Sequence, residues 1–216
     1  MIQKKAFDYY VEEEIRSSYN YFKKYFKDTI FLSKNNIRHY AIKEALKNHR
    51  PEFTYLEFGV FKGETLRLFS KYLKEKKAVI YGFDSFQGLN ENWQGTRMMK
   101  GFFSNNGKIP KINKNCKIVK GKVQDTLDNF IKNKKNLKIN FLHMDLDTYP
   151  STKFTLNKIK KYLINNSYIL FDELYNMEGW KSGEFKALIE IFKKNEFKYV
   201  AFSSDREQVL IQCKKK

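Results

Sequence analysis

Cysteine, proline and long apolar runs are scarce in this chain of 216 residues, and each scarcity excludes a class of protein. The two cysteines, Cys116 and Cys213, lie far apart and in no metal-ligand spacing, so we interpret them as free thiols in a reducing compartment. The three prolines fall at expected element boundaries, not in a linker. No apolar run approaches the roughly 18 residues of a membrane span. Residues Met1–Asp8 have no apolar stretch behind them, so we expect no secretory signal and a cytoplasmic protein.

Arginine is also scarce, although the formal net charge is +18. A strongly basic balance is typical of proteins that bind nucleic acid or anionic surfaces. Such proteins use the forked guanidinium of arginine to grip phosphate, whereas the excess here is nearly all lysine. Because Asn, Ile, Phe and Tyr are abundant too, the composition is more typical of drift in an AT-rich genome. Nucleic acid is therefore disfavoured as a partner, but a nucleic-acid-binding or RNA-modifying protein is kept as an alternative.

Strands alternate with helices after Pro51, which predicts an α/β fold with a mostly parallel sheet and helices on both faces. Apolar periodicity predicts seven strands, at Thr54–Phe58, Val79–Phe83, Lys117–Lys120, Ile139–Asp145, Tyr168–Asp172, Lys198–Ser203 and Gln208–Cys213. It predicts helices at Phe7–Lys27, Asn36–Lys47, Glu64–Lys74, Gln124–Lys132, Ser151–Leu163 and Ser182–Lys194.

The last two predicted strands are separated only by Ser204–Glu207, which is too short for a crossover helix. They must form a hairpin, so the last strand is expected to be antiparallel. The resulting prediction is a Rossmann-like, seven-stranded sheet with an antiparallel last strand. We expect one domain overall, in which residues 1–50 form an N-terminal helical extension packed on the core formed by residues 51–216.

A turn that contains glycine follows the first of the core strands and opens a helix. Gly59 permits a tight turn and close approach of a ligand, and Gly63 lies where the helix begins and its free N–H groups favour a carboxylate. Asp84 ends the next strand, about 20 residues beyond Gly63, where a carboxylate accepts hydrogen bonds from the ribose of a nucleoside. Glu57 is a carboxylate in a strand that should be buried, so it needs a partner. A turn without a ligand, with Asp84 in solvent, is the alternative.

Four carboxylates follow two later strands. Asp145 and Asp147 are two residues apart, so their side chains point the same way in an extended chain, and Asp172 and Glu173 follow the next strand. Crowded carboxylates repel one another unless a cation or raised pKa values relieve them. Mg²⁺ prefers such oxygen ligands and keeps positions open for a substrate. A helix cap at Asp147 and ordinary loop acids at the other pair are the alternatives.

Several motifs resemble those of class I S-adenosylmethionine-dependent methyltransferases, and within them the macrocin-O-methyltransferase-like enzymes. The resemblance spans about Tyr55 to Leu188. Its motifs are E/D-x-G-x-x-x-G-x-S/T at Glu57–Thr65, F-D-S-F-x-G-L at Phe83–Leu89, G-x-x-x-D-T-L at Gly121–Leu127, D-x-D-x-Y-x-S-T at Asp145–Thr152 and G-W-x-x-G-E-x-K-A at Gly179–Ala187.

This resemblance implies S-adenosylmethionine as the methyl donor. Around its amino-acid part it places Glu57, Gly59 and Gly63, and it places Asp84 on the ribose, with Thr65 and Ser85 completing the cofactor-binding set. It also implies Asp145 as a metal ligand, Asp147 as the general base, and Asp172 with Glu173 as the rest of the Mg²⁺ site. Glu173 departs from the family, which often has aspartate there.

The function expected from this resemblance is metal-assisted O-methylation of a sugar or glycosylated small molecule. A metal-dependent methyltransferase for catechol-type phenols is the nearest alternative. Trp93, Phe102 and Phe103 lie in a segment without periodicity, from Ser85 to about Asn115, which is expected to be a lid over the site or a loop with exposed aromatics. The sequence leaves open whether the chain forms a homo-oligomer.

Overall fold

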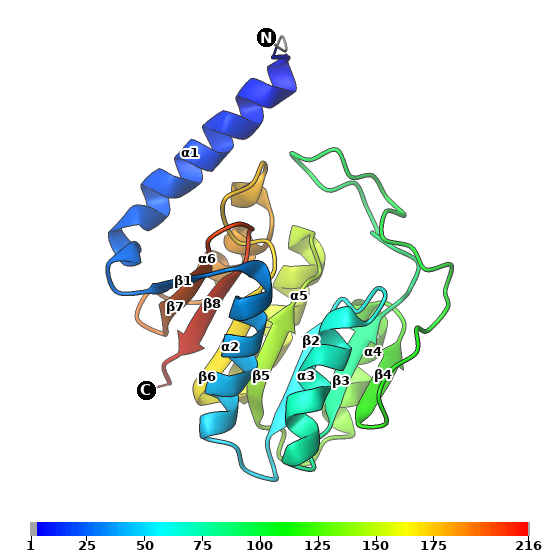
Figure 1. The fold of residues 1–216 in the computed structure, drawn as a ribbon. Coiled ribbons are helices and arrows are strands. Elements are labelled where there is room, and N and C mark those ends of the chain that lie inside the picture. Colours follow the sequence, from blue (N-terminus) through cyan, green and yellow to red (C-terminus); the bar gives the residue numbers. More distant parts are fainter. Residues whose placement is uncertain (1–3, 216) are drawn as a thin grey trace.

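Eight strands form a single mixed sheet in the order β1-β7-β8-β6-β5-β2-β3-β4 in the computed structural model, which describes residues 4–215 (Figure 1). The strands are β1 (Ile30–Leu32), β2 (Thr54–Phe58), β3 (Ile80–Asp84), β4 (Cys116–Lys120), β5 (Ile139–Met144), β6 (Leu163–Phe171), β7 (Phe197–Ser203) and β8 (Val209–Cys213). The hairpin is confirmed, because β8 is antiparallel to both of its neighbours, β6 and β7. All other pairings are parallel.

The Rossmann-like fold class is confirmed, but the described sheet has one strand more than predicted. Strand β1 pairs with β7 at the edge of the sheet, inside the segment expected to be helical only. Three residues are too few for an alternating pattern to indicate a strand. The expected division at residue 51 stays a prediction, and residues 1–3 and 216 of the expected segments lie outside the described residues.

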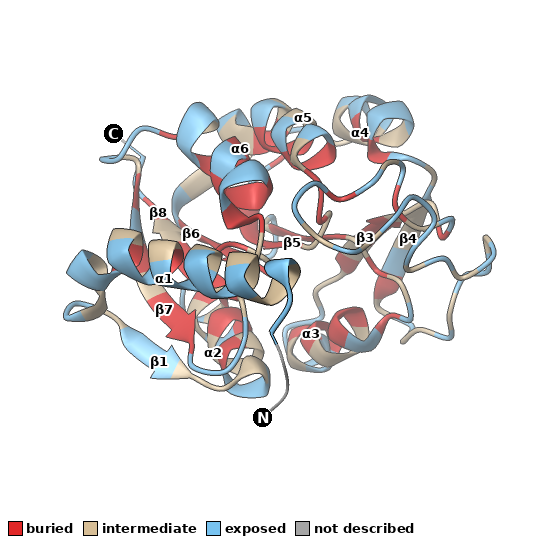
Figure 2. Cartoon of the chain, turned by 90° about the horizontal axis from the view of Figure 1, so that it is seen from above, coloured by how far each residue is buried: buried red, intermediate tan, exposed pale blue. Residues whose placement is uncertain are grey.

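Helices cover both faces of the sheet (Figure 2). They are α1 (Ala6–Phe26), α2 (Lys34–Lys47), α3 (Glu64–Glu75), α4 (Val123–Lys132), α5 (Tyr149–Ile159) and α6 (Glu184–Ile191), with short 3₁₀ turns at Lys160–Tyr162 and Trp180–Ser182. Helices α2 and α3 pack on one face, and α1, α4, α5 and α6 pack on the other. No helix of the described residues is both long and apolar enough to cross a membrane.

Strand β2 shows how the core divides between the two faces. Its five residues are all buried, and alternate side chains belong to different apolar clusters. Leu56 and Phe58 pack on the side of α4 to α6, whereas Tyr55 packs on the side of α2 and α3. A central parallel strand covered on both faces reads as a continuous apolar run, so the one charged member, Glu57, stands out.

The segment between β3 and β4 has no helix or strand beyond an isolated bridge between Gln87 and Ser104. Its aromatic residues differ in environment. Trp93 is buried in the core, Phe103 packs edge-on against Phe61, and Phe102 is exposed. The segment is therefore folded onto the domain, and only part of it is available to contact a ligand.

Candidate active site

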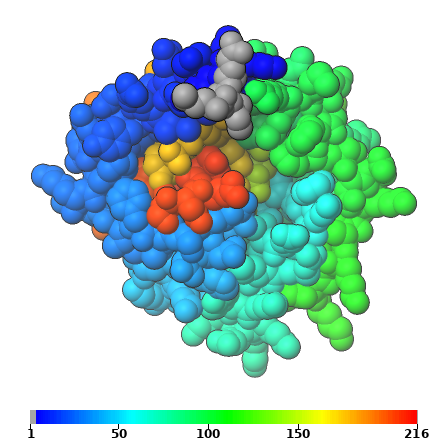
Figure 3. Space-filling view, turned by 45° about the horizontal axis from the view of Figure 1, so that its top comes forward, coloured from blue at the N-terminus to red at the C-terminus, as the bar shows by residue number. Residues whose placement is uncertain are grey.

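A pocket of about 290 Å³ lies at the carboxyl ends of the strands. Figure 3 shows the hollow at this edge, between α1 in blue and the green segment that follows β3. The residues that line it lie at or after the carboxyl ends of β4, β3, β2, β5 and β6, and on α2. Seven of the predicted site residues line it: Gly59, Asp84, Ser85, Asp145, Asp147, Asp172 and Glu173. Glu57, Gly63 and Thr65 do not line it.

The backbone around Gly59 leaves no room for a side chain. Its φ is +87°, in the left-handed region that favours glycine, and a Cβ there would lie 1.7 Å from the carbonyl oxygen of Asp145. The close approach that the structure shows is to the backbone after β5, and Gly59 also lines the pocket. Gly63 precedes α3 with φ +72°, and its Cβ position faces Pro110 and Arg67, outside the pocket.

Asp84 holds the glycine turn in place. One carboxylate oxygen accepts hydrogen bonds from the backbone N–H groups of Val60 and Phe61, at 2.8 and 2.7 Å. The other accepts one from the N–H of Phe86, at 2.7 Å. An ionised carboxylate has about four lone-pair sites, so Asp84 retains capacity to accept a hydroxyl donor from the pocket.

Glu57 lies fully buried beneath this turn. Its Oε1 accepts a hydrogen bond of 2.7 Å from the Thr65 hydroxyl. Its Oε2 has no hydrogen-bond partner within the described chain, although the Nδ1 of His143 lies 3.9 Å away. Burial raises the pKa of Glu57 to about 8. Thr65 is thus the partner that a buried carboxylate requires, and both residues act from behind the pocket wall.

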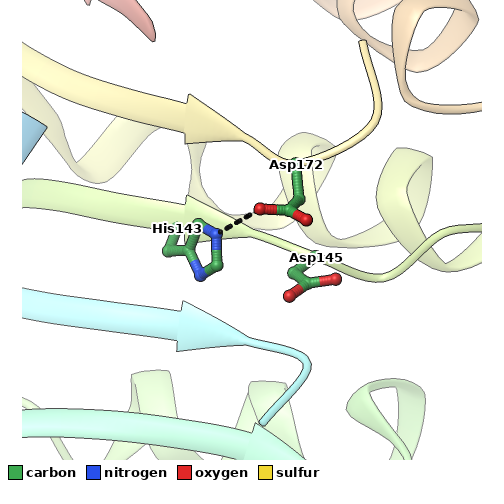
Figure 4. A group of neighbouring side chains, drawn as sticks. All are labelled: His143, Asp145 and Asp172. Atoms are coloured by element: carbon green, nitrogen blue, oxygen red, sulfur yellow. Dashed lines mark hydrogen bonds and ion pairs between the residues drawn. The ribbon is translucent and has the colours of Figure 1, made fainter. Parts of the chain in front are cut away.

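Three carboxylates converge after β5 and β6. Asp145, Asp147 and Glu173 each place an oxygen within 4.8 Å of the others, and Asp145 also forms such a group with His143 and Asp172 (Figure 4). Burial and mutual repulsion raise the pKa values of Asp145 and Glu173 and raise the pKa of Asp147 to about 8. The site therefore favours a cation.

Asp147 reaches this group through a turn. Strand β5 ends at Met144, and Asp147 has φ +59°, so the extended alternation expected for Asp145 and Asp147 does not apply. Aspartate tolerates the left-handed region better than most residues. Backbone strain at a polar pocket residue is a common feature of functional sites.

Asp172 is held differently from the other acids. Its Oδ1 accepts hydrogen bonds from Arg38 at 2.9 Å, Gln208 at 3.0 Å and His143 at 3.3 Å. Burial raises the pKa of Asp172, but the His143 hydrogen bond and the Arg38 charge outweigh burial, and the net pKa lies well below its usual range. Asp172 is therefore ionised and fixed in position.

Glu184, at the start of α6, belongs to the same cluster. It is fully buried, its Oε2 accepts a 3.1 Å hydrogen bond from the backbone N–H of Glu173, and its Oε1 has no partner within residues 4–215. Burial raises the pKa of Glu184. An acid in the first turn of a helix is usually read as a surface residue that complements the helix dipole, so the sequence carried little signal for this role.

These residues fit a hard divalent cation. Asp145, Asp147 and Glu173 all offer carboxylate oxygens, and the Oε2 of Glu173 is buried without a hydrogen-bond partner in the described structure. A buried carboxylate oxygen without a donor is costly, and a cation would supply the missing charge. The longer side chain of Glu173, compared with aspartate, does not prevent it from meeting Asp145 and Asp147.

A family described as a methyltransferase domain matches residues 56–174, more than half of the chain. The chain belongs to this family. It is an S-adenosylmethionine-dependent methyltransferase, so the pocket at the tips of β2 and β3 has a donor to hold. No curated protein sequence matches the chain.

Solved structures share the fold of this methyltransferase. The calicheamicin methyltransferase CalS11 is 19% identical, with a TM-score of 0.69 over 93% of this chain and 85% of that one. An apo structure of CalS11, described as a TDP-rhamnose 3′-O-methyltransferase in calicheamicin biosynthesis, is 20% identical, with a TM-score of 0.60 over 81% and 76%. The O-methyltransferase NovP is 21% identical, with a TM-score of 0.62 over 84% and 79%.

Proposed function

We propose that this methyltransferase transfers the methyl group of S-adenosylmethionine to a hydroxyl of a sugar or a glycosylated small molecule, with the help of Mg²⁺. The observation that carries the proposal is the convergence of Asp145, Asp147 and Glu173 at the wall of the pocket. An acidic group of this kind suits a cation and an oxygen nucleophile. The likeness to CalS11, described as acting on TDP-rhamnose, supports a sugar hydroxyl as the acceptor.

In this proposal Asp145, Asp172 and Glu173 hold the cation, which supplies charge that makes an acceptor hydroxyl easier to ionise. Asp147 takes the hydroxyl proton while the oxygen forms a bond to the methyl carbon and the carbon–sulfur bond of the donor breaks. Burial raises the pKa of Asp147 to about 8 while no cation is bound, and a cation beside it would favour the ionised form that can accept the proton. Arg38 and His143 keep Asp172 ionised and oriented.

In the donor site of this proposal, Asp84, beside Ser85, accepts hydrogen bonds from the ribose hydroxyls. Gly59 lets the backbone of the turn lie close to the donor. Glu57 and Thr65 support this turn from beneath, and Gly63 starts the helix behind it. The position of Asp84 and Ser85 in the pocket wall, at the tip of β3, supports these assignments.

The test is methyl transfer from labelled S-adenosylmethionine to a panel of nucleotide sugars, glycosides and catechols, with Mg²⁺ and with EDTA. Transfer to sugar hydroxyls that EDTA abolishes is the expected result. Transfer to catechols alone would show that the acceptor is a phenol and not a sugar. Transfer that persists in EDTA would show that the reaction does not need the metal. A salt-sensitive complex with RNA, followed by RNA methylation, would instead favour the lysine-rich surface as the acceptor site.

A further inference from the structure

A row of four buried polar side chains crosses the sheet. Glu57 on β2 and His143 on β5 are partners in the parallel register, so their side chains lie side by side on the same face. On one side the row continues to Asp172, directly after β6, toward which the His143 ring points (Figure 4). On the other side it ends at Thr65 of α3, through the hydrogen bond to Glu57. We call these residues the polar row.

The polar row lacks one hydrogen bond, between Glu57 and His143. The His143 ring packs edge-on against Phe69 of α3, with the ring centroids 5.3 Å apart, and its side chain is fully buried. Its Nδ1 has no hydrogen-bond partner in the described chain, and neither has the Oε2 of Glu57. These two atoms lie 3.9 Å apart. Because a buried polar atom without a partner is costly, both atoms would gain from a hydrogen bond to each other.

The donors and acceptors of the polar row are in an order that allows this bond. The Asp172 oxygen that faces His143 also accepts hydrogen bonds from Arg38 and Gln208, so His143 donates to it from Nε2. Burial lowers the pKa of His143, and a neutral imidazole that donates from Nε2 has a free lone pair on Nδ1. Burial favours the protonated form of Glu57, which has a hydroxyl to donate to that lone pair. A shift of about 1 Å would bring the two atoms to hydrogen-bond distance.

We propose that His143 is a positioning residue that couples binding of the methyl donor to binding of the divalent cation. Glu57 and Thr65 lie beneath the glycine turn that lines the pocket, and Asp172 lies in the group that the proposed function assigns to the cation. A ligand at either site that brings Glu57 and His143 together also favours the arrangement that the other site needs, and such coupling is reciprocal. The inference rests on the proposed function but is independent of the direction in which the donor lies in the pocket.

The test measures this coupling by calorimetric titration of the full chain with S-adenosylhomocysteine, with and without Mn²⁺. This ligand lacks the sulfonium charge of the donor, so direct repulsion by the cation does not obscure the result. We expect Mn²⁺ to strengthen the binding of S-adenosylhomocysteine to the wild type by roughly 5-fold or more, within the usual range of coupling between two sites.

Three variants separate the two contacts of His143. In His143→Gln an amide near the position of Nε2 can donate to Asp172, but no polar atom replaces Nδ1. We expect this variant to bind Mn²⁺ alone within about 3-fold of the wild type and to lose the enhancement by Mn²⁺. His143→Asn, which can reach Glu57 but not Asp172, should lose the enhancement as well. Glu57→Gln is the control, because it keeps an oxygen for the Thr65 hydroxyl and an N–H for Nδ1, and it should retain the enhancement.

Enhancement that persists in His143→Gln or His143→Asn would overturn the inference. Poor binding of Mn²⁺ alone to His143→Gln would also overturn it, because it would show that the variant disturbs the cation site itself. Absence of enhancement in a wild type that binds both ligands would overturn the coupling and leave the proposed function intact. Failure of the proposed function gives a different result, since the wild type would then not bind S-adenosylhomocysteine or Mn²⁺, and both proposals would fall.

Discussion

The carbonyl oxygen of Asp145 occupies the space that a side chain on Gly59 would need, since a Cβ built there lies 1.7 Å away. The glycine turn after β2 and the loop that carries the acids therefore pack backbone against backbone. A hydrogen bond of 2.8 Å from the Asp145 N–H to the Phe58 carbonyl holds the same junction. The glycine turn and the acidic loop therefore form one packed unit.

We expect Gly59→Ala to lower the free energy of unfolding by roughly 3 kcal/mol or more and to abolish binding of S-adenosylhomocysteine, because it combines positive-φ strain with a backbone clash. Gly101→Ala is a matched control: its φ is +86° and nothing lies within 4 Å of its Cβ position. That control should cost only about 1 kcal/mol. Chemical denaturation of both variants checks this, and equal losses would show that the junction with Asp145 tolerates a side chain.

The second prediction concerns Asp147. We expect Asp147→Asn to lower turnover by roughly 10²-fold while the affinity for S-adenosylhomocysteine stays nearly unchanged, because the amide cannot take a proton. Asparagine tolerates the φ of +59° at this position, so the loop should keep its shape. Steady-state kinetics and calorimetry measure the two quantities. A near-normal turnover would show that Asp147 is not the general base. A large loss of metal affinity would show that Asp147 is a metal ligand.

The third prediction concerns Glu184, which holds the backbone of Glu173. We expect Glu184→Ala to weaken Mn²⁺ binding by about 10-fold or more and to destabilise the fold by about 1–3 kcal/mol, because the N–H of Glu173 loses its acceptor. Glu184→Gln keeps an acceptor oxygen and should restore most of the metal affinity. Titration followed by the magnetic resonance of Mn²⁺ separates the two. If the glutamine variant binds metal as poorly as the alanine variant, the charge of Glu184 matters and not its hydrogen bond.

The strand tips were the part of the site that the sequence predicted best. Asp84 ends β3, and Asp145 and Asp172 follow β5 and β6. Because parallel strands present their carboxyl ends at one edge of a sheet, the local pattern was enough to predict that these acids share one pocket. The sequence did not predict which of these acids would be hydrogen-bonded within the protein. Asp84 is tied to the glycine turn and Asp172 to Arg38 by contacts between segments distant in the chain.

The sequence did not predict features that are very short or that depend on contacts between distant segments. Strand β1 is three residues long, Asp147 turns where alternation predicted extension, and the neighbour of Gly59 is a carbonyl oxygen from the loop after β5. Local periodicity carries no information on such tertiary contacts. The role of Glu184 likewise depends on α6 packing against the loop after β6.

The fourth prediction concerns pH and Glu57, whose pKa burial raises to about 8 in the folded protein, against about 4.3 in an unfolded chain. Between these values the folded state binds more protons than the unfolded state, so the contribution of Glu57 to stability is lost as the pH rises through about 8. Glu57→Gln keeps an oxygen to accept the Thr65 hydroxyl and removes the titration. Denaturation in EDTA at pH 5 and pH 8 should therefore show a larger fall for the wild type than for the variant. Equal falls would mean that Glu57 is already ionised, with a counter-charge supplied to its unpartnered Oε2.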